Sequence, residues 1–201
     1  MARHSDLRLC AAVLAAGQSR RFGEADKLTE HLEGMPVGLH IVRTVSELDC
    51  AERLVVTASD DHACADDWRA HGFTVAVNTK AHEGMGTSVA HAAAWAAARE
   101  ADALLIFLAD MPFVPLGHLE QMIALFAADP GQRTIASCGG AALSPPATFG
   151  KALFPELSQL AGDTGARAIL RDARQLSLPA SQLADIDTLD DLQRARSRTA
   201  P

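Results

Sequence analysis

The stretch that decides the fold is ALLIFLADMP, residues 103–112. Residues 103–109 are all apolar and Pro112 follows closely, a pattern that predicts a strand buried on both faces. Asp110 comes at the carboxyl end of this strand, where open α/β sheets bind their ligands. We therefore predict an α/β fold with a ligand, such as a divalent metal, at Asp110. A simple capping role for this carboxylate in the next turn is the alternative.

Segments typical of strands and helices alternate along the rest of the chain. The predicted strands are residues 7–14, 53–58, 73–77, 134–137 and 175–178. The predicted helices are residues 36–48, 84–100, 116–128, 151–160 and 164–173. Two more are predicted from their caps: one capped by Ser59 or Asp60 and ending near residue 71, and a terminal helix capped by Thr188. Residues 144–146 are expected to form an irregular break. Such alternation implies a largely parallel sheet covered on both faces.

Composition narrows the class of protein. A chain of 201 residues is most simply one domain, and its net charge of −7, from 18 basic and 25 acidic residues, argues against a protein that coats nucleic acid. No apolar run reaches the ~18 residues of a membrane span, and we expect neither a signal peptide nor membrane contact. The four cysteines show no C-x-x-C spacing, so we expect buried, reduced thiols and a cytoplasmic protein.

A loop rich in small residues follows the first predicted strand. Residues 14–23 read LAAGQSRRFG, and successive backbone amides in such a loop can bind an anion. Arg20, Arg21 and Lys27 add positive charge nearby. The loop matches neither the G-x-G-x-x-G fingerprint nor a Walker A motif. An ordinary turn with solvated arginines is the alternative to a phosphate site.

Three further features lie near predicted strand ends or helix starts. Asn78 ends a strand and could contact a base or sugar, or else simply form a turn. Residues 84–88, GMGTS, open a helix, whose N-terminus suits an anion or a sugar hydroxyl. Residues 185–192, DIDTLDDL, hold four crowded aspartates, of which Asp190 and Asp191 suit the first turn of a helix.

Six motifs in order resemble those of the MobA-like nucleotidyltransferases, closest to the branch of molybdenum cofactor cytidylyltransferase. They are LAAG-x-S-x-RFG with Lys27-Leu28 (residues 14–28), Val77-Asn78, GMGTS (84–88), LADMPF (108–113), GDTGAR (162–167) and DIDTLDDL (185–192). The resemblance covers nearly the whole chain. It implies a Rossmann-like nucleotidyltransferase fold with a mostly parallel mixed sheet and helices on both faces. This is a single domain over residues 1–201, with a nucleotide-binding part at about 7–115 and an acceptor-binding part at about 116–201.

The resemblance also implies a reaction. A phosphate on the acceptor attacks the α-phosphorus of a nucleoside triphosphate, and pyrophosphate leaves. By motif position, Arg21, Lys27 and Asp110 are the catalytic residues, and Asp110 with Asp187 holds Mg²⁺, a cation that prefers oxygen ligands. The nucleotide-binding set implied by the motifs is Leu14, Ala15, Ala16, Gly17, Ser19, Arg21, Lys27, Asn78, Gly84 and Ser88.

The resemblance favours CTP as donor and molybdopterin as acceptor. Ala16 stands where the guanylyltransferase branch has glycine, and its methyl group could crowd a purine. Residues 143–150 and Val89-Ala90 depart from the family pattern on the acceptor side. GTP, or a sugar phosphate or other phosphorylated alcohol, therefore stays an alternative, as do an NAD(P)-binding oxidoreductase and a non-catalytic cofactor chaperone. A transient contact with a molybdoenzyme or its chaperone would follow from the leading hypothesis.

Overall fold

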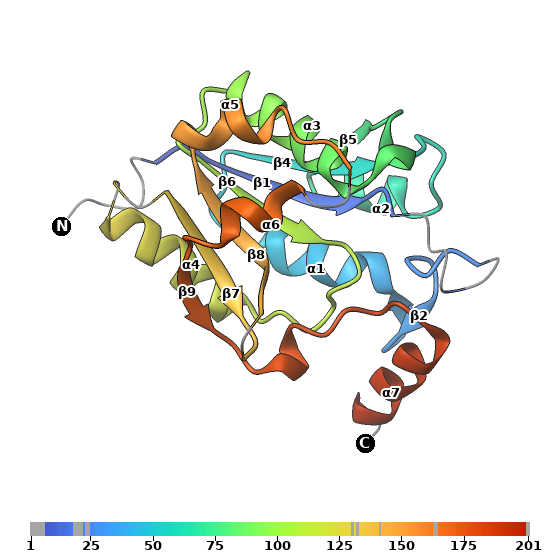
Figure 1. Cartoon of the computed structure of the whole chain (residues 1–201). Coiled ribbons are helices and arrows are strands. Elements are labelled where there is room, and N and C mark those ends of the chain that lie inside the picture. The colour runs from blue at the N-terminus through green and yellow to red at the C-terminus, as the bar shows by residue number, and fades with distance from the viewer. Residues whose placement is uncertain are drawn as a thin grey trace.

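A seven-stranded mixed sheet forms the centre of the molecule (Figure 1). The computed structural model describes residues 7–17, 22, 25–129, 131, 133–140, 142–162 and 165–199. The strands lie in the order β5-β4-β1-β6-β8-β7-β9. Their bounds are β1 Leu9–Ala15, β4 Glu52–Thr57, β5 Thr74–Val77, β6 Ala103–Leu108, β7 Thr134–Cys138, β8 Leu143–Gly150 and β9 Arg174–Ser177. All run in one direction except β8, which pairs antiparallel with both of its neighbours.

Strands β1 and β6 form the buried centre of this sheet. Every residue of β1 is buried, and it pairs in parallel with β4 on one side and β6 on the other. The pairing places Leu14 opposite Leu108, so the two strands end at the same edge. The strand predicted from ALLIFLADMP is thus confirmed, and Asp110 lies just beyond its carboxyl end.

Helices cover both faces of the sheet (Figure 1). One core lies against α1 (Val37–Ser46), α2 (Ala65–Ala70), α4 (Leu116–Ala128) and α7 (Leu189–Thr199), and the other lies against α3 (Met85–Ala97), α5 (Phe154–Leu157) and α6 (Gly165–Leu170). Alternate residues of β1 enter opposite cores: Ala11 and Val13 the first, Ala12 and Leu14 the second. This strict two-sided burial explains why the strands read as continuous apolar runs.

Short elements join these layers. A two-stranded hairpin, β2 (His31–Leu32) and β3 (Met35–Pro36), precedes α1. Three 3₁₀ turns, η2 (Ala81–Glu83), η3 (Lys151–Leu153) and η4 (Ala180–Gln182), lie before α3, α5 and α7.

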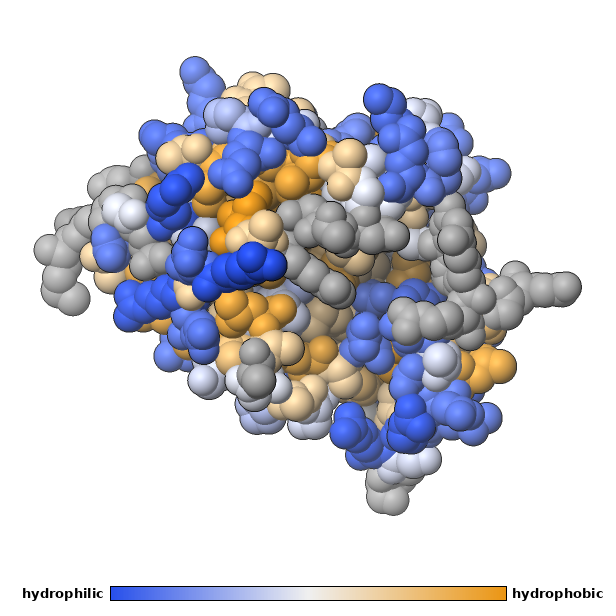
Figure 2. Space-filling model, in the orientation of Figure 1, coloured by the Kyte–Doolittle hydropathy of each residue, from blue (hydrophilic) through white to orange (hydrophobic). Residues whose placement is uncertain are grey.

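In Figure 2, apolar surface shows between α5 and α6, with hydrophilic residues around it. No helix of the described residues is long and apolar enough to cross a membrane.

Two local predictions were wrong. Residues 144–146 lie inside strand β8 instead of forming a break, because the strand accommodates the two prolines as an irregularity: Ala147 pairs with Ala136 and Ser144 with Ser137, and Pro145 and Pro146 have no partner in β7. Prolines lack the N–H that a strand ladder needs, and an irregularity within their own strand tolerates them. Helix α2 begins only at Ala65, since the Ser59 hydroxyl bonds the Asp61 carboxylate and caps no helix.

The cysteines are buried and unlinked, as predicted. Burial raises the pKa of Cys10, Cys50 and Cys64 to about 11. A thiol with so high a pKa is a poor nucleophile near neutral pH. These side chains therefore serve as small apolar packing groups.

Candidate functional site

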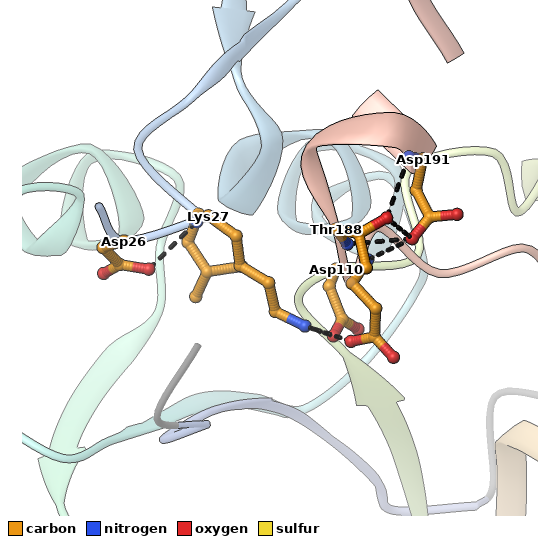
Figure 3. Close-up of polar contacts among 7 residues, drawn as sticks. Asp26, Lys27, Asp110, Thr188 and Asp191 are labelled. Atoms are coloured by element: carbon orange, nitrogen blue, oxygen red, sulfur yellow. Dashed lines mark hydrogen bonds and ion pairs between the residues drawn. The ribbon is translucent and has the colours of Figure 1, made fainter. Parts of the chain in front are cut away.

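A lysine lies between two carboxylates at the carboxyl edge of the sheet (Figure 3). The Lys27 Nζ atom is 2.5 Å from Asp110 Oδ2 and 2.7 Å from Asp187 Oδ1. The side chains are only 10%, 17% and 21% exposed, in that order. Since both carboxylates bind one nitrogen, their contacting oxygens can be no farther apart than the sum of those two distances. The structure thus brings together the predicted metal ligands and the predicted catalytic lysine.

The backbone sets the two carboxylates side by side. Beyond β6, the Ala109 N–H donates to the Leu14 carbonyl at 3.1 Å, which extends the pairing with β1 to the residue before Asp110. The Ile186 N–H then donates to the Asp110 carbonyl at 2.9 Å. This second bond joins the segment containing Asp187 directly to the end of β6.

The start of helix α7 holds Asp187 from its other side. Thr188 caps this helix as predicted: its Oγ1 accepts the Asp191 N–H at 3.1 Å, and Asp191 Oδ2 accepts the Thr188 N–H at 2.8 Å (Figure 3). Reciprocal bonds of this kind form a capping box and fix the path of the chain into a helix. The Asp187 N–H also donates to Asp191 Oδ2, at 3.3 Å.

A turn holds the backbone of Lys27. The Asp26 Oδ1 atom accepts the Leu28 N–H, and the Asp26 carbonyl accepts the Thr29 N–H, both at 3.0 Å. On the far side of Asp26, the carboxylate lies 2.7 Å from His62 Nε2. The His62 ring stacks on buried Trp68, with ring centroids 4.5 Å apart. This support was not anticipated from the sequence, which separates Asp26 from His62 by the whole of α1 and β4.

The charges in the cluster favour a protonated lysine. Burial works to lower the pKa of Lys27, but the Asp110 and Asp187 carboxylates outweigh it, so the pKa lies above its usual value. A third carboxylate, Asp185, has its pKa raised by desolvation and by the charges of Asp187 and Asp110. The cluster is therefore rich in negative charge that only cations can balance.

The carboxylates also fit the divalent cation that the sequence predicts. Asp110 Oδ1 is buried and has no hydrogen-bond partner among the described residues, which is costly unless a ligand uses it. Carboxylate oxygens are the ligands that Mg²⁺ and Mn²⁺ accept. Among the described residues no group of three acidic, histidine or cysteine side chains forms a complete cage. A cation here would need further oxygens, such as phosphate and water, as Mg²⁺ usually does.

The loop after β1 is described only in part. Leu14, Ala15 and Ala16 are buried, and a methyl group at Gly17 would meet no atom within 4 Å. The predicted phosphate-binding residues Ser19 and Arg21 lie outside the described residues. At the edge where β1 ends, the chain therefore passes from buried residues to a glycine with open space beside it.

A second group of predicted residues surrounds the start of α3. The Asn78 side chain is buried; its Nδ2 donates to Thr87 Oγ1 at 2.9 Å and to Ser88 Oγ at 3.0 Å, and its Oδ1 accepts the Lys80 N–H at 3.0 Å. Gly84 precedes α3 with φ of 117°, an angle that favours glycine. The amide of Asn78 thus ties the end of β5 to the first turn of α3.

Two residues of this region were missed from the sequence. Thr87 accepts from Asn78 although only its place in GMGTS hinted at a role. Gly86 packs closely on the segment after α5. A Cβ added at Gly86 would lie 2.7 Å from the Gly162 carbonyl oxygen, and the Gly86 N–H donates to that oxygen at 2.8 Å. The motif beginning at Gly162 therefore supports α3, while residues 163–164 of the motif lie outside the described residues.

A cavity of about 580 Å³ lies beside this second group. It opens between the end of β5, the first turns of α3 and the segment after α5. Its wall carries two basic side chains, Lys80 and His91, and one acidic side chain, Glu83. Burial lowers the pKa of His91, which favours its neutral form.

The fold, together with a family match over most of the chain, defines a nucleotidyltransferase. The family model described as the MobA-like NTP transferase domain matches residues 11–179. The chain belongs to this family.

Known proteins of similar sequence carry different names. Purine catabolism protein PucB of Bacillus subtilis is 31% identical over 194 residues, which are 92% of this chain and 91% of PucB. Molybdenum cofactor guanylyltransferase of Cereibacter sphaeroides is 33% identical over 135 residues, 67% of this chain and 65% of that protein. The name of the second relative and the family model support nucleotidyl transfer as the class of reaction.

Solved structures share the fold. Rv0371c of Mycobacterium tuberculosis superposes with a TM-score of 0.73 at 21% identity, covering 94% of this chain and 98% of that one. A second structure of Rv0371c is a complex with manganese and has a TM-score of 0.71 at 21% identity, with the same coverage of both chains. The predicted Rossmann-like fold with a mostly parallel mixed sheet is thus confirmed.

Proposed function

We propose that the protein transfers CMP from CTP to molybdopterin or its molybdenum-loaded form and releases pyrophosphate. The observation that carries a transfer reaction is the Lys27–Asp110–Asp187 cluster at the edge where β1 and β6 end. The choice of CTP rests on the LAAG loop, residues 14–17, and the choice of acceptor on the resemblance of the motifs. The wall of the acceptor site, expected around residues 143–150, differs from the family pattern.

Each residue of the cluster has a task in this proposal. Asp110, through the Oδ1 atom that no described residue bonds, and Asp187 would hold a divalent cation, Mg²⁺ or Mn²⁺. When bound, that cation supplies neutralisation of the triphosphate and polarisation of the phosphate under attack. Lys27 and Arg21 would bind phosphate oxygens and balance the charge that develops on the leaving pyrophosphate. The acceptor phosphate is ionised near neutral pH, so no general base is required.

The second group of residues would position the nucleotide. The Asn78 bonds to Thr87 and Ser88 hold the first turn of α3 against the end of β5. Gly84 and the amides that follow it would then face the nucleotide at a helix N-terminus. Because the Asn78 amide nitrogen already donates to two hydroxyls, we assign Asn78 a positioning task beside the base contact predicted for it.

GTP is the second candidate donor. The relative from Cereibacter sphaeroides is named a guanylyltransferase, which favours a purine. Against it stands Ala16, where a methyl group would crowd a purine packed on the loop. The Ala16 side chain is largely buried, at 7% exposed. CTP and GTP must therefore be compared directly as donors.

Pyrophosphate release tests the proposal. The protein is incubated with Mg²⁺, molybdopterin and each of the four nucleoside triphosphates in turn, with Asp110→Asn as the inactive control. Release with CTP alone is the expected result. Release with GTP instead would overturn the base assignment, and release only with other phosphorylated acceptors would overturn molybdopterin. Absence of release with every donor and acceptor would refute nucleotidyl transfer by this site.

A further inference from the structure

The Lys27 ammonium contacts the carboxylates that the proposed function assigns to a metal. We propose that Lys27 and a divalent cation are alternative partners of Asp110 and Asp187, so that the cation binds tightly only when a triphosphate has drawn the ammonium away. This inference rests on the proposed function, because it takes the pair of carboxylates as the metal site. It assigns Lys27 a second task, to exclude the metal until the nucleotide arrives.

The two carboxylates form the fixed half of this device. The Ile186 N–H bonds the Asp110 carbonyl, and the capping box of Thr188 and Asp191 holds the chain directly after Asp187. Groups whose backbones are held on both sides keep their separation when a ligand changes. A cation can therefore take the place of the ammonium without rearrangement of the fold.

The side chain of Lys27 is the movable half. Its backbone is held by the Asp26 turn, so the ammonium can move only by rotation about the bonds of its flexible four-carbon stem. Among the described residues, the ammonium bonds only Asp110 and Asp187. A triphosphate offers the lysine oxygens of equal or greater negative charge, which replaces what it loses.

Charge repulsion prevents the two cations from sharing the pair. An ion bound to both carboxylates would approach the ammonium to within a few ångströms, and like charges at that separation repel strongly in a partly buried site. Asp110 Oδ1 alone is a single ligand, whereas Mg²⁺ and Mn²⁺ bind several oxygens. The arrangement therefore predicts weak metal binding to the nucleotide-free protein.

Binding of Mn²⁺ alone tests the inference. The free Mn²⁺ signal in electron paramagnetic resonance is followed during titration of the nucleotide-free protein, its Lys27→Met variant and a Lys151→Met control. Lys151 pairs with Asp102 at 2.7 Å and is largely exposed, so the control removes the same charge away from the site. If the ammonium leaves the site open in about a tenth of the molecules, Lys27→Met should bind Mn²⁺ about tenfold more tightly, with Lys151→Met unchanged.

Equal or weaker Mn²⁺ binding by Lys27→Met would overturn the inference, as would the same gain in Lys151→Met. The methionine variant leaves two carboxylates facing each other and could fail to fold for that reason. Lys27→Gln keeps a neutral donor between the carboxylates and must then show the same gain in Mn²⁺ affinity. Pyrophosphate release by the wild-type protein separates the two proposals. Transfer without any gain in Mn²⁺ affinity refutes the competition alone, whereas absence of transfer with every donor refutes the proposed function.

Discussion

Replacement of Gly86 by alanine is expected to destabilise the protein, although alanine is the better helix former. Gly86 lies in the first turn of α3, and an added Cβ would lie 2.7 Å from the Gly162 carbonyl oxygen and 2.9 Å from the Ala161 carbonyl carbon. Both atoms belong to the backbone, so no side-chain rotation can relieve the contact. The segment after α5 must move away from α3, and the 2.8 Å bond from the Gly86 N–H to Gly162 must lengthen.

The magnitude follows from opposing terms. Overpacking of a close contact costs about 1–3 kcal/mol, and weakening the hydrogen bond adds about 0.5–1.5 kcal/mol. The helix propensity of alanine returns about 1 kcal/mol. The net loss in the free energy of unfolding is therefore about 0.5–3.5 kcal/mol. For a chain of this size that corresponds to a fall of roughly 1–14 °C in Tm.

Urea and thermal unfolding followed by circular dichroism measure this loss. The matched control is Gly117→Ala, at the start of α4, where glycine is exposed and an added Cβ would meet no atom within 4 Å. The control should gain about 0.4–1 kcal/mol from reduced freedom of the unfolded chain. If Gly86→Ala is as stable as Gly117→Ala, the close packing of α3 on residues 161–162 is wrong.

Three more measurements follow from the structure. Asp110→Asn should lower kcat for pyrophosphate release by about a hundredfold or more without lowering Tm, and activity within a few-fold of wild type would remove Asp110 from the reaction. Burial lowers the pKa of His118, so the unfolded chain binds a proton more readily than the folded protein does. His118 should therefore lower the free energy of unfolding as the pH falls through about 6.5. In urea unfolding at pH 7.5 and 5.5, His118→Gln should therefore lose less stability on acidification than the wild type; an equal loss would contradict the sign. Trp68→Phe removes the 3.0 Å bond from Nε1 to the Gly38 carbonyl and should cost about 1–3 kcal/mol in the same assay.

The sequence predicted the parallel part of the sheet because its signals are local. Residues 103–109 are apolar without interruption, and such a run is typical of a strand covered on both sides. The bounds of α4, predicted as residues 116–128, agree with the structure, and Thr188 caps α7 as its position before two aspartates suggested. The alternation of elements, together with the motifs, also led to the correct family.

Local signals were weaker where neighbours decide the conformation. Two adjacent prolines normally indicate a break, yet residues 144–146 belong to β8, where Pro145 and Pro146 form an irregularity without partners in β7. Ser137 helps to hold that place: its hydroxyl donates to the Pro146 carbonyl and contacts buried His118, both at 2.8 Å. Ser137 lies 9 positions from Pro146 and 19 positions from His118 in the sequence, so no local pattern predicts these two contacts.

By itself the sequence determined the class of fold and the buried strand that ends before Asp110, and it predicted which charged residues belong to the site. Only the tertiary structure decided that the Lys27 ammonium pairs with both Asp110 and Asp187, residues 83 and 160 positions away in the chain. The physical reason is that periodicity reports on which face of an element is buried, whereas contacts across the sheet edge depend on strand order and register. Those are set by the packing of the whole domain.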